Sequence, residues 1–287
     1  MAMKLHALVV PYDSGFRGLR MGAGPERLLG SGILDGLRAA RAEVTVETFE
    51  ASPDTLRGEI SSAIEIGQWL AKHVAAARRE GALALILAGN CMTSVGTVAG
   101  LQARSRRVPG VCWFDSHADF NTPETTVSGF LDGMALATLT GRCWKKLIEN
   151  VPDFRPIPDE QILLFGVRNS EWLERKALES SEIHWMKAHG DAPLATEELS
   201  ALRDRFGEVY LHVDLDVLDE SEGRVNRYSS KGGLSGARLI QLVHEIGASF
   251  HVGAAALTAY DPSCDVEGRI PAIARKIVET IAGSIMD

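Results

Sequence analysis

The chain has 287 residues, of which 45% are hydrophobic and 24% are charged, and these fractions are ordinary for a soluble globular protein. The formal net charge of -8 argues against nucleic acid as the main partner, because phosphate binding needs a basic face. No apolar run reaches the roughly 18 residues of a membrane span, so we expect neither a nucleic-acid nor a membrane partner.

The start of the chain and its cysteines favour a cytoplasmic protein. The first residues lead directly into a strand pattern, and we expect no signal peptide. The cysteines show no CxxC spacing, so we expect reduced thiols. They are Cys91, Cys112, Cys143 and Cys264.

Short apolar runs alternate along the chain with helical periodicity. Continuous runs such as residues 83–87 are typical of parallel strands that are covered on both faces. Helical patterns such as residues 61–80 repeat apolar side chains at three- and four-residue steps. The predicted strands are 5–10, 44–48, 83–87, 111–114, 162–167, 182–186, 209–214 and 252–259. The predicted helices are 25–40, 61–80, 95–105, 135–147, 196–206, 235–250 and 271–285.

This alternation predicts the fold class. Strands that alternate with helices imply right-handed crossovers and a parallel sheet with helices on both faces. We therefore predict an α/β protein, a three-layer α-β-α sandwich around a parallel sheet of about eight strands. No linker, repeat or low-complexity segment is obvious, so we expect residues 1–287 to form a single domain.

Two of the predicted strands end in alternating ionisable residues. The run 111–114 is followed by Asp115, His117 and Asp119, and the run 209–213 by Asp214 and Asp216. If the backbone after residue 114 stays extended, alternate side chains fall on one side. Two carboxylates beside one neutral imidazole repel each other unless a cation lies between them.

The two segments are expected to share one cleft. In open α/β sheets, ligands bind at the carboxyl ends of the strands, so these five side chains can meet there. Oxygen-rich ligands with one imidazole suit Mn²⁺ better than a structural zinc site. The alternative is that the acids merely cap strand ends and helices. Neither motif is specific alone, and the strength of the prediction comes from their pairing.

At these residues the chain resembles the ureohydrolase superfamily of arginase, agmatinase and formimidoylglutamase. The resemblance covers nearly the whole chain in order and length, and it implies an arginase-like fold. It is carried by Asp115–Pro123, Ser128–Gly129, Gly133–Met134 and Asp214–Asp219.

The resemblance implies a binuclear metal-dependent hydrolase with two Mn²⁺ per subunit. Asp115 and Asp214 would bridge both ions, Asp119 would complete one site, and His117 with Asp216 the other. Two close divalent ions can bridge a water and lower its pKa towards neutrality, and the resulting hydroxide would attack the planar carbon of the substrate. Family members are often trimers or hexamers, so a homo-oligomer is expected by analogy.

Cys91 departs from the family pattern, because it stands where a histidine ligand is expected. Either Cys91 binds as a thiolate, which suits zinc or iron better than manganese, or it is a small packed residue that leaves that metal site weak or empty. A different divalent metal, or a single ion, is therefore an open alternative to two Mn²⁺.

Two more departures concern catalysis and the substrate. Asp132 replaces a histidine that is thought to relay protons, and a desolvated carboxylate can also do acid–base work; Asp132 and Asp119 are the candidate catalytic residues. Ala259 replaces a glutamate that pairs with the guanidinium. Either Asp132 or Asp261 substitutes for it, or the substrate is not a plain guanidinium, since an unpaired buried charge is costly.

The remaining substrate-binding candidates follow from the same resemblance. Asn121 and Ser128 match positions that hold the amino-acid end of the substrate, and Glu171 is a weaker match in that role. The expected substrate is a small guanidino, hydroxyguanidino or formimidoyl compound. His184, His189, His212, His244 and His251 show no ligand spacing and are expected to be core or surface residues.

Three functions remain as alternatives. The first is the metal-dependent C–N hydrolase described above. The second is a divergent member with weak or lost catalysis that binds a ligand or a single ion, which Cys91, Asp132 and Ala259 favour. The third is another metallohydrolase on a similar sheet, such as a deacetylase, which residues 121–123 and 214–216 fit less well.

Overall fold

The computed structural model describes residues 3–52, 58–186, 202–203 and 205–286. An eight-stranded sheet with the order β4-β1-β5-β10-β9-β6-β7-β8 lies at its centre. All neighbouring strands in this sheet are parallel, as predicted. Its strands are β1 (Lys4–Val10), β4 (Glu43–Thr48), β5 (Leu83–Ala88), β6 (Gly110–Phe114), β7 (Ile162–Phe165), β8 (His184–Met186), β9 (Glu208–Asp214) and β10 (His251–Thr258).

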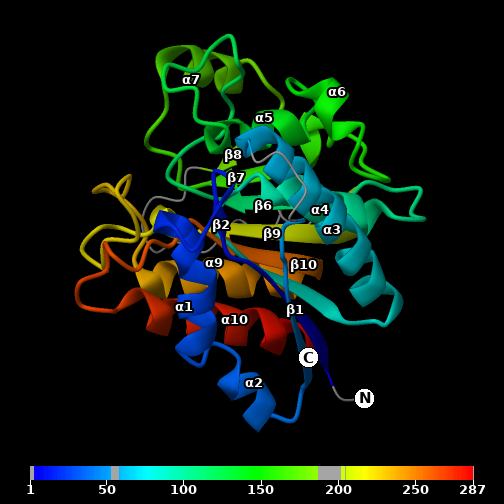
Figure 1. The fold of residues 1–287 in the computed structure, drawn as a ribbon, viewed down its shortest axis with the longest axis vertical. Helices are drawn as coiled ribbons and strands as arrows, with labels where there is room; N and C mark the ends of the chain where they lie inside the picture. The colour runs from blue at the N-terminus through cyan, green and yellow to red at the C-terminus, as the bar shows by residue number, and fades with distance from the viewer. Residues whose placement is uncertain (1–2, 53–57, 187–201, 204, 287) are drawn as a thin grey trace.

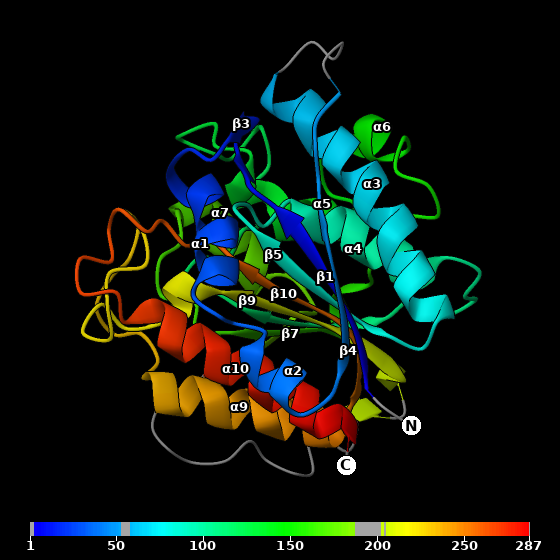
Figure 2. The same ribbon diagram turned by 60° about the horizontal axis from the view of Figure 1, so that its bottom comes forward.

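Helices cover both faces of the sheet, which gives the predicted three layers (Figures 1 and 2). One face carries α1 (Gly24–Gly30), α2 (Asp35–Ala39), α9 (Gly236–Ser249) and α10 (Ile270–Met286). The other carries α3 (Glu59–Arg79), α4 (Thr93–Gln102), α5 (Ala135–Leu139), α6 (Lys145–Ile148) and α7 (Trp172–Glu179). No helix in these described ranges is long and apolar enough to cross a membrane.

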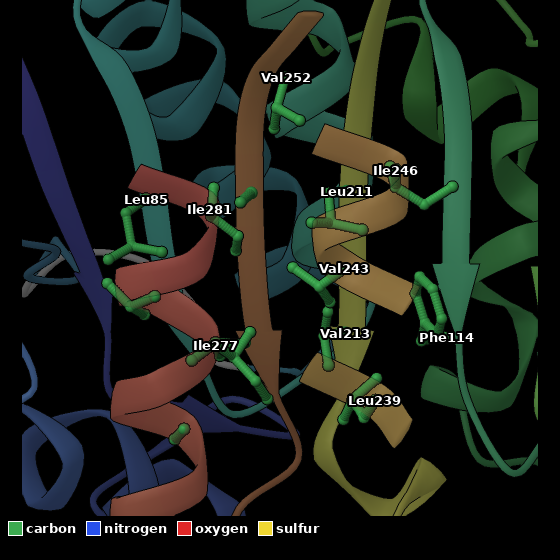
Figure 3. Packing of buried hydrophobic residues seen from close by; sticks show 14 of the residues in the cluster. Leu85, Phe114, Leu211, Val213, Leu239, Val243, Ile246, Val252, Ile277 and Ile281 are labelled. Atoms are coloured by element: carbon green, nitrogen blue, oxygen red, sulfur yellow. The ribbon is translucent and has the colours of Figure 1, made fainter. Parts of the chain in front are cut away.

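Apolar packing between the helices and the sheet forms the core. Figure 3 shows α9 and α10 lying over the middle strands, with Val243 of α9 beside the side chains of Leu211 and Val213 on β9. Every residue of β5 is buried, as expected for a parallel strand covered on both faces. This burial is what holds the strand ends in fixed positions.

Two helices that the sequence pattern predicted as continuous are broken. The predicted helix 25–40 is split into α1 and α2 around Gly32, whose φ of +78° is outside the helical region. The predicted helix 135–147 is split into α5 and α6 around Gly141, which has a φ of +72°. Glycine adopts positive φ without a steric penalty, so in both places apolar periodicity continued past the end of a helix.

The start of the chain and the region before β9 complete the comparison of predicted and observed elements. The glycine-rich stretch from Pro11 to Gly24 contains a small hairpin of β2 (Tyr12–Asp13) and β3 (Phe16–Arg17). It also contains a 3₁₀ turn, Arg20–Ala23. The predicted helix 196–206 and His189 lie largely or wholly outside the described residues.

The order of the strands positions the candidate site. After β5 the chain continues into β6, which lies three places away in the sheet, and β10 and β9 later fill the space between them. The carboxyl ends of β5, β10, β9 and β6 are therefore side by side. A crevice at the carboxyl ends of strands, where the strand order switches, is the usual ligand site in such sheets.

Candidate metal centre

A cavity of about 540 Å³ opens at the carboxyl ends of these strands. Most of the side chains predicted to act there line it, namely Cys91, His117, Asp119, Asn121, Ser128, Asp132, Glu171, Asp214 and Asp216. Asp115 is buried directly beside them, because His117 Nδ1 lies 3.4 Å from its carboxylate. Segments about a hundred residues apart in the chain thus meet in one place.

The segment after β6 is not extended. The side chains of Asp115, His117 and Asp119 therefore do not converge by the simple strand alternation that the sequence suggested. β6 ends at Phe114, and Asp119 has a φ of +49°. Backbone hydrogen bonds hold the turn, because the Ser116 carbonyl accepts from the N–H groups of Arg168 and Asn169 at 2.9 Å. The ionisable side chains therefore converge through an irregular loop fixed against the end of β7.

Asp115 is oriented by its own segment. Its carboxylate accepts a hydrogen bond from the backbone N–H of His117 at 2.7 Å and another from the indole N–H of Trp113 at 3.2 Å. His117 Nδ1 lies 3.4 Å from carboxylate oxygens of both Asp115 and Asp216. These three side chains form one group whose donor atoms could hold a metal ion.

The second acidic pair is held by a tight turn. Asp214 caps a short 3₁₀ turn and accepts a hydrogen bond from the backbone N–H of Asp216 at 2.8 Å. The carboxylate of Asp216 accepts from the Ser116 hydroxyl at 2.8 Å and from the amide of Asn226 at 3.2 Å. Each carboxylate thus has a fixed direction.

The cavity floor carries more negative charge than its side chains balance. Burial raises the pKa values of Asp119 and Asp214 well above the ordinary range, and neighbouring carboxylates raise them further. Burial opposes charge on His117, but Asp216 and Asp115 outweigh this and raise its pKa to about 12. Burial also opposes charge on Asp216, but His117 holds its pKa below the usual range.

This charge pattern fits a divalent cation. The guanidinium of Arg168 also lines the cavity but donates to the backbone carbonyls of residues 216–218, so burial and mutual repulsion leave the carboxylates short of positive charge and favour protons on His117 and on buried carboxyl groups. A bound cation would supply that charge and displace the protons. Carboxylate oxygens with one imidazole are donors that divalent manganese accepts, so the residues present fit the expected metal.

Cys91 lies at the same floor. It follows β5, is fully buried, and its thiol donates to the carboxylate of Asp214 at 3.1 Å. Burial, together with the surrounding carboxylates, raises the pKa of this thiol well above its ordinary value. Without a cation Cys91 is therefore a protonated thiol, and a metal ion is required to make it a thiolate.

Asp132 points into the cavity from the loop before α5. Its carboxylate accepts hydrogen bonds from the backbone N–H of Met92 and the amide of Asn90, both at 3.0 Å. Burial raises the pKa of Asp132 to about 7, although both of these hydrogen bonds oppose the shift. A carboxyl group with this pKa can exchange a proton near neutral pH.

The substrate-binding candidates occupy different places. Asn121, Ser128 and Glu171 line the cavity, with Ser128 exposed at its mouth. Asp261 is not among the lining residues, and one of its carboxylate oxygens accepts from both the backbone N–H and the hydroxyl of Ser263. Ala259 does line the cavity. At the position where the family has a glutamate, the cavity wall therefore carries an uncharged methyl group.

The sequence did not identify several residues that line the cavity or lie beside it. Phe130 and Tyr228 stack at 5.9 Å at the mouth. Glu174 is buried and lines the cavity, and its spacing from Glu171 matches the capping box at the start of α7. His212 was expected to be a core or surface residue and is fully buried. The strand alternation that placed Asp214 also places His212 on the same face.

Comparisons with known proteins identify relatives of this chain. The model of the Arginase family matches residues 8–283. The arginase of Brucella melitensis biotype 1 is 29% identical over 308 aligned positions, which cover 100% of this chain and 98% of the relative. The arginase of Bacillus caldovelox is 27% identical over 228 positions, which cover 74% of this chain and 76% of the relative.

Solved structures share the fold. The native arginase of Bacillus caldovelox superimposes with a TM-score of 0.86 at 24% identity and covers 99% of both chains. A formimidoylglutamase from Bacillus subtilis has a TM-score of 0.74 at 18% identity, covering 99% of this chain and 87% of its own. An agmatine ureohydrolase of Thermoplasma volcanium has a TM-score of 0.69 at 16% identity, covering 99% and 89%. The arginase-like fold predicted from the sequence is confirmed.

Proposed function

Because the chain belongs to the arginase family, we propose that it is a hydrolase that cleaves a linear, non-peptide C–N bond with the help of two divalent cations. The substrate class is a guanidino, hydroxyguanidino or formimidoyl compound. One observation carries the proposal: carboxylates from two distant segments and His117 surround one cavity, where burial and mutual repulsion raise the pKa values of Asp119 and Asp214. The family match also favours this function over that of a deacetylase.

The cations would be held at the floor by Asp115, His117, Asp119, Asp214 and Asp216, with Mn²⁺ as the metal of the family pattern. When bound, two such ions supply the positive charge that lowers the pKa of a water and polarises the carbon under attack. The protein's own part is to hold the donors in place, through the hydrogen bonds that orient Asp115 and Asp216.

Asp132 is the proposed proton carrier. It lies in the cavity wall, and its pKa of about 7 allows it to take a proton from the attacking water and return it to the leaving nitrogen. Asn90 and the backbone N–H of Met92 hold its carboxylate in a fixed orientation for both transfers. Asp119 lies beside it at the floor and assists through its negative charge.

Asn121, Ser128 and Glu171 are proposed to hold the polar end of the substrate near the mouth. Ala259 offers no charge to pair with a guanidinium, so Asp132 is the proposed substitute. Asp261 is a weaker candidate, because it does not line the cavity and Ser263 hydrogen-bonds to its carboxylate. This arrangement favours substrates whose reacting group is less basic than a guanidinium, such as hydroxyguanidino compounds.

The test is to measure bound metal, and the release of urea, ammonia and formamide from a panel of such substrates with added Mn²⁺. We expect about two ions per chain and one released product. Asp115→Asn should abolish both, because it removes a carboxylate that would hold the cations. Glu124→Gln is the matched control, since Glu124 is exposed on the same loop. Metal binding without any product from the panel would contradict the proposal.

A second candidate function is binding of a ligand or a single ion with weak or lost catalysis. The hydrogen bond from the Cys91 thiol to Asp214 favours it, because it ties up a carboxylate that would otherwise bridge two ions. Under this alternative, metal analysis gives at most one ion per chain at saturating Mn²⁺, and no product forms.

Three further expectations stay proposals. We propose that residues 1–287 form a single domain, that the protein acts in the cytoplasm, and that it assembles as a homo-oligomer, a trimer or hexamer by analogy with the family. Light scattering of the purified protein would give the assembly size directly.

A further inference from the structure

We propose that His212 is a metal ligand and that Cys91, His212 and Asp115 form a mixed sulfur, nitrogen and oxygen site at the cavity floor. The inference rests on the proposed function, because it concerns one of the cations at that floor. It differs from it in naming a histidine that has no place in the family pattern and in changing the class of metal.

The three side chains come from three of the four strand ends that lie side by side at the cavity. Cys91 follows β5, His212 lies near the end of β9, and Asp115 follows β6. His212 pairs in register with Trp113, two residues before Asp115. Donor atoms of the three side chains all lie within 4.8 Å of one another. Donors around one tetrahedral ion are about 3.3 to 3.8 Å apart, so shifts of about 1 Å would complete the site.

The imidazole of His212 is oriented as metal-binding imidazoles are. Its Nδ1 is hydrogen-bonded to the hydroxyl of Tyr210 at 2.8 Å, and its ring stacks on Trp113 with centroids 3.7 Å apart. In metal sites the ring nitrogen that does not bind the ion is usually held by such a partner, which fixes the tautomer. In the tautomer in which Nδ1 donates to the Tyr210 oxygen, Nε2 carries a lone pair.

That lone pair faces the cluster and lacks a strong partner. The nearest partner of Nε2 is the hydroxyl of Thr258 at 3.4 Å, which is long for a hydrogen bond. The same hydroxyl is 3.3 Å from the sulfur of Cys91 and 3.5 Å from Asp214. A fully buried imidazole whose acceptor nitrogen is poorly satisfied is unusual for a packing residue, and a cation would satisfy it.

Cation binding at this site has a balanced proton count. The Cys91 thiol now donates its proton to Asp214 at 3.1 Å. When the sulfur binds a divalent ion, that proton leaves to solvent and the carboxylate of Asp214 becomes free to bind as well. The ion therefore gains a thiolate and a carboxylate, with release of the thiol proton and of any proton held on the Asp214 carboxyl group.

These donors change the metal that the site prefers. A thiolate with an imidazole suits zinc, ferrous iron or cobalt better than manganese. The other donors of the floor, His117 and Asp216, keep the oxygen-rich character that suits manganese. The ligand atoms at the two ends of the cavity floor thus differ in chemical softness. The end with the softer thiolate ligand should select a Zn²⁺-type or Fe²⁺-type ion.

Cobalt titration of the metal-free full-length protein tests this directly, because a thiolate bound to Co²⁺ gives a near-ultraviolet charge-transfer band. We expect the band in the wild-type protein. It should vanish in Cys91→Ala and persist in Cys112→Ala, since Cys112 is equally buried but belongs to the core cluster beneath α9 and α10. Cobalt bound without the band would overturn the assignment of Cys91.

The same band reports on His212. In His212→Asn it should require at least about tenfold more Co²⁺ to develop, as loss of a ligand costs no less than loss of a supporting hydrogen bond. His73→Asn is the matched control, because His73 lies on α3 with its Nδ1 2.7 Å from the carbonyl of Trp69. An unchanged midpoint in His212→Asn would overturn the role of His212.

A measurement that needs no change at His212 guards against misfolding. In cobalt-loaded His117→Asn, we expect a paramagnetically shifted, exchangeable imidazole N–H signal to remain, from His212. Its absence overturns the proposal.

Failure of the proposed function gives a different result: the cobalt band would be present, but no substrate of the panel would give a product. Products formed without the band would instead support the hydrolase function and contradict the proposed Cys91–His212–Asp115 site.

Discussion

At the residue scale, an imbalance of charge governs the site. Four carboxylates from residues 115–119 and 214–216 lie buried together, with His117 Nδ1 3.4 Å from two of them and the guanidinium of Arg168 in the cavity wall. Such a cluster is costly unless protons or cations balance it. The folded protein therefore maintains these side chains at a cost that metal binding would remove, and this is why they are better explained by function than by capping.

Asp132→Asn tests the proposed proton carrier. We expect kcat to fall by about 10²- to 10⁴-fold, the usual contribution of a general acid–base group, with little change in bound metal. Asp132 must be ionised to accept a proton, so wild-type kcat/KM should rise as the pH increases through about 7. Added cations would move this rise to lower pH. A pH–rate profile of both proteins is the measurement.

The contradicting outcome is equally clear. If Asp132→Asn keeps the same rise in kcat/KM and a rate close to that of Glu124→Gln, another group carries the proton. Equal metal content in the two variants is needed for the comparison, and it is expected because Asp132 is bonded to Asn90 and Met92 rather than to the metal-binding carboxylates.

The predictability of individual site residues depended on the regularity of their surroundings. Asp115 and Asp214 directly follow apolar strands, and strand ends of a parallel sheet meet at one edge, so sequence reasoning could bring them together. Asn226 lies in an irregular loop and reaches Asp216 only through tertiary packing. His212 lies inside a strand, where a buried histidine is normally read as core.

At the element scale, the sheet was more predictable than the helices. Continuous apolar runs such as β5 and β9 have few alternatives in an α/β protein. The breaks around Gly32 and Gly141 depend on backbone conformations that apolar periodicity does not report. The position of β10 and β9 between β5 and β6 also could not be predicted, because long-range strand order is decided by packing rather than by local pattern.

The close packing of α3 on α4 gives a prediction about stability. A Cβ at Gly96 would collide with the carbonyl oxygen of Gly67 on α3. Gly96→Ala should therefore lower the free energy of unfolding by about 1–3 kcal/mol, the usual cost of overpacking. The same change at Gly283 in α10 meets no atom within 4 Å, so it should stabilise by about 0.5–1 kcal/mol through helix propensity.

Chemical denaturation of the two glycine variants checks this pair. α4 follows directly after Cys91, so loosening it should also weaken metal binding in Gly96→Ala but not in Gly283→Ala. Equal stability of both variants would show that α3 and α4 can separate freely and that they do not hold the β5 end of the site in place.

At the scale of the whole molecule, stability should depend on pH and metal together. Raised pKa values at Asp119, Asp132, Asp214 and His117 mean that the folded protein binds more protons than the unfolded chain. Stability of the metal-free protein is therefore lost as the pH rises from about 5.5 to about 8. The lowered pKa of Asp216 adds no slope there, because its contribution is complete above the unfolded value.

Metal should reverse this trend. Because metal binding releases protons, its affinity increases with pH. An ion at a hundredfold excess over its Kd stabilises by about 2.7 kcal/mol, so Mn²⁺ or Zn²⁺ should raise Tm by several degrees at about pH 8 and by less at about pH 5.5. Calorimetry with and without a chelator measures both effects. A metal-induced shift that is larger at the lower pH would contradict the charge account.

The central claim is that side chains from residues 115–119 and 214–216 gather around divalent cations. The most direct measurement is anomalous diffraction from crystals of the protein equilibrated with Mn²⁺ and, separately, with Zn²⁺. We predict anomalous peaks at the cavity floor in contact with Asp115 and Asp214. Metal bound to the protein in solution, with the crystals showing peaks only away from these two carboxylates, would contradict the account.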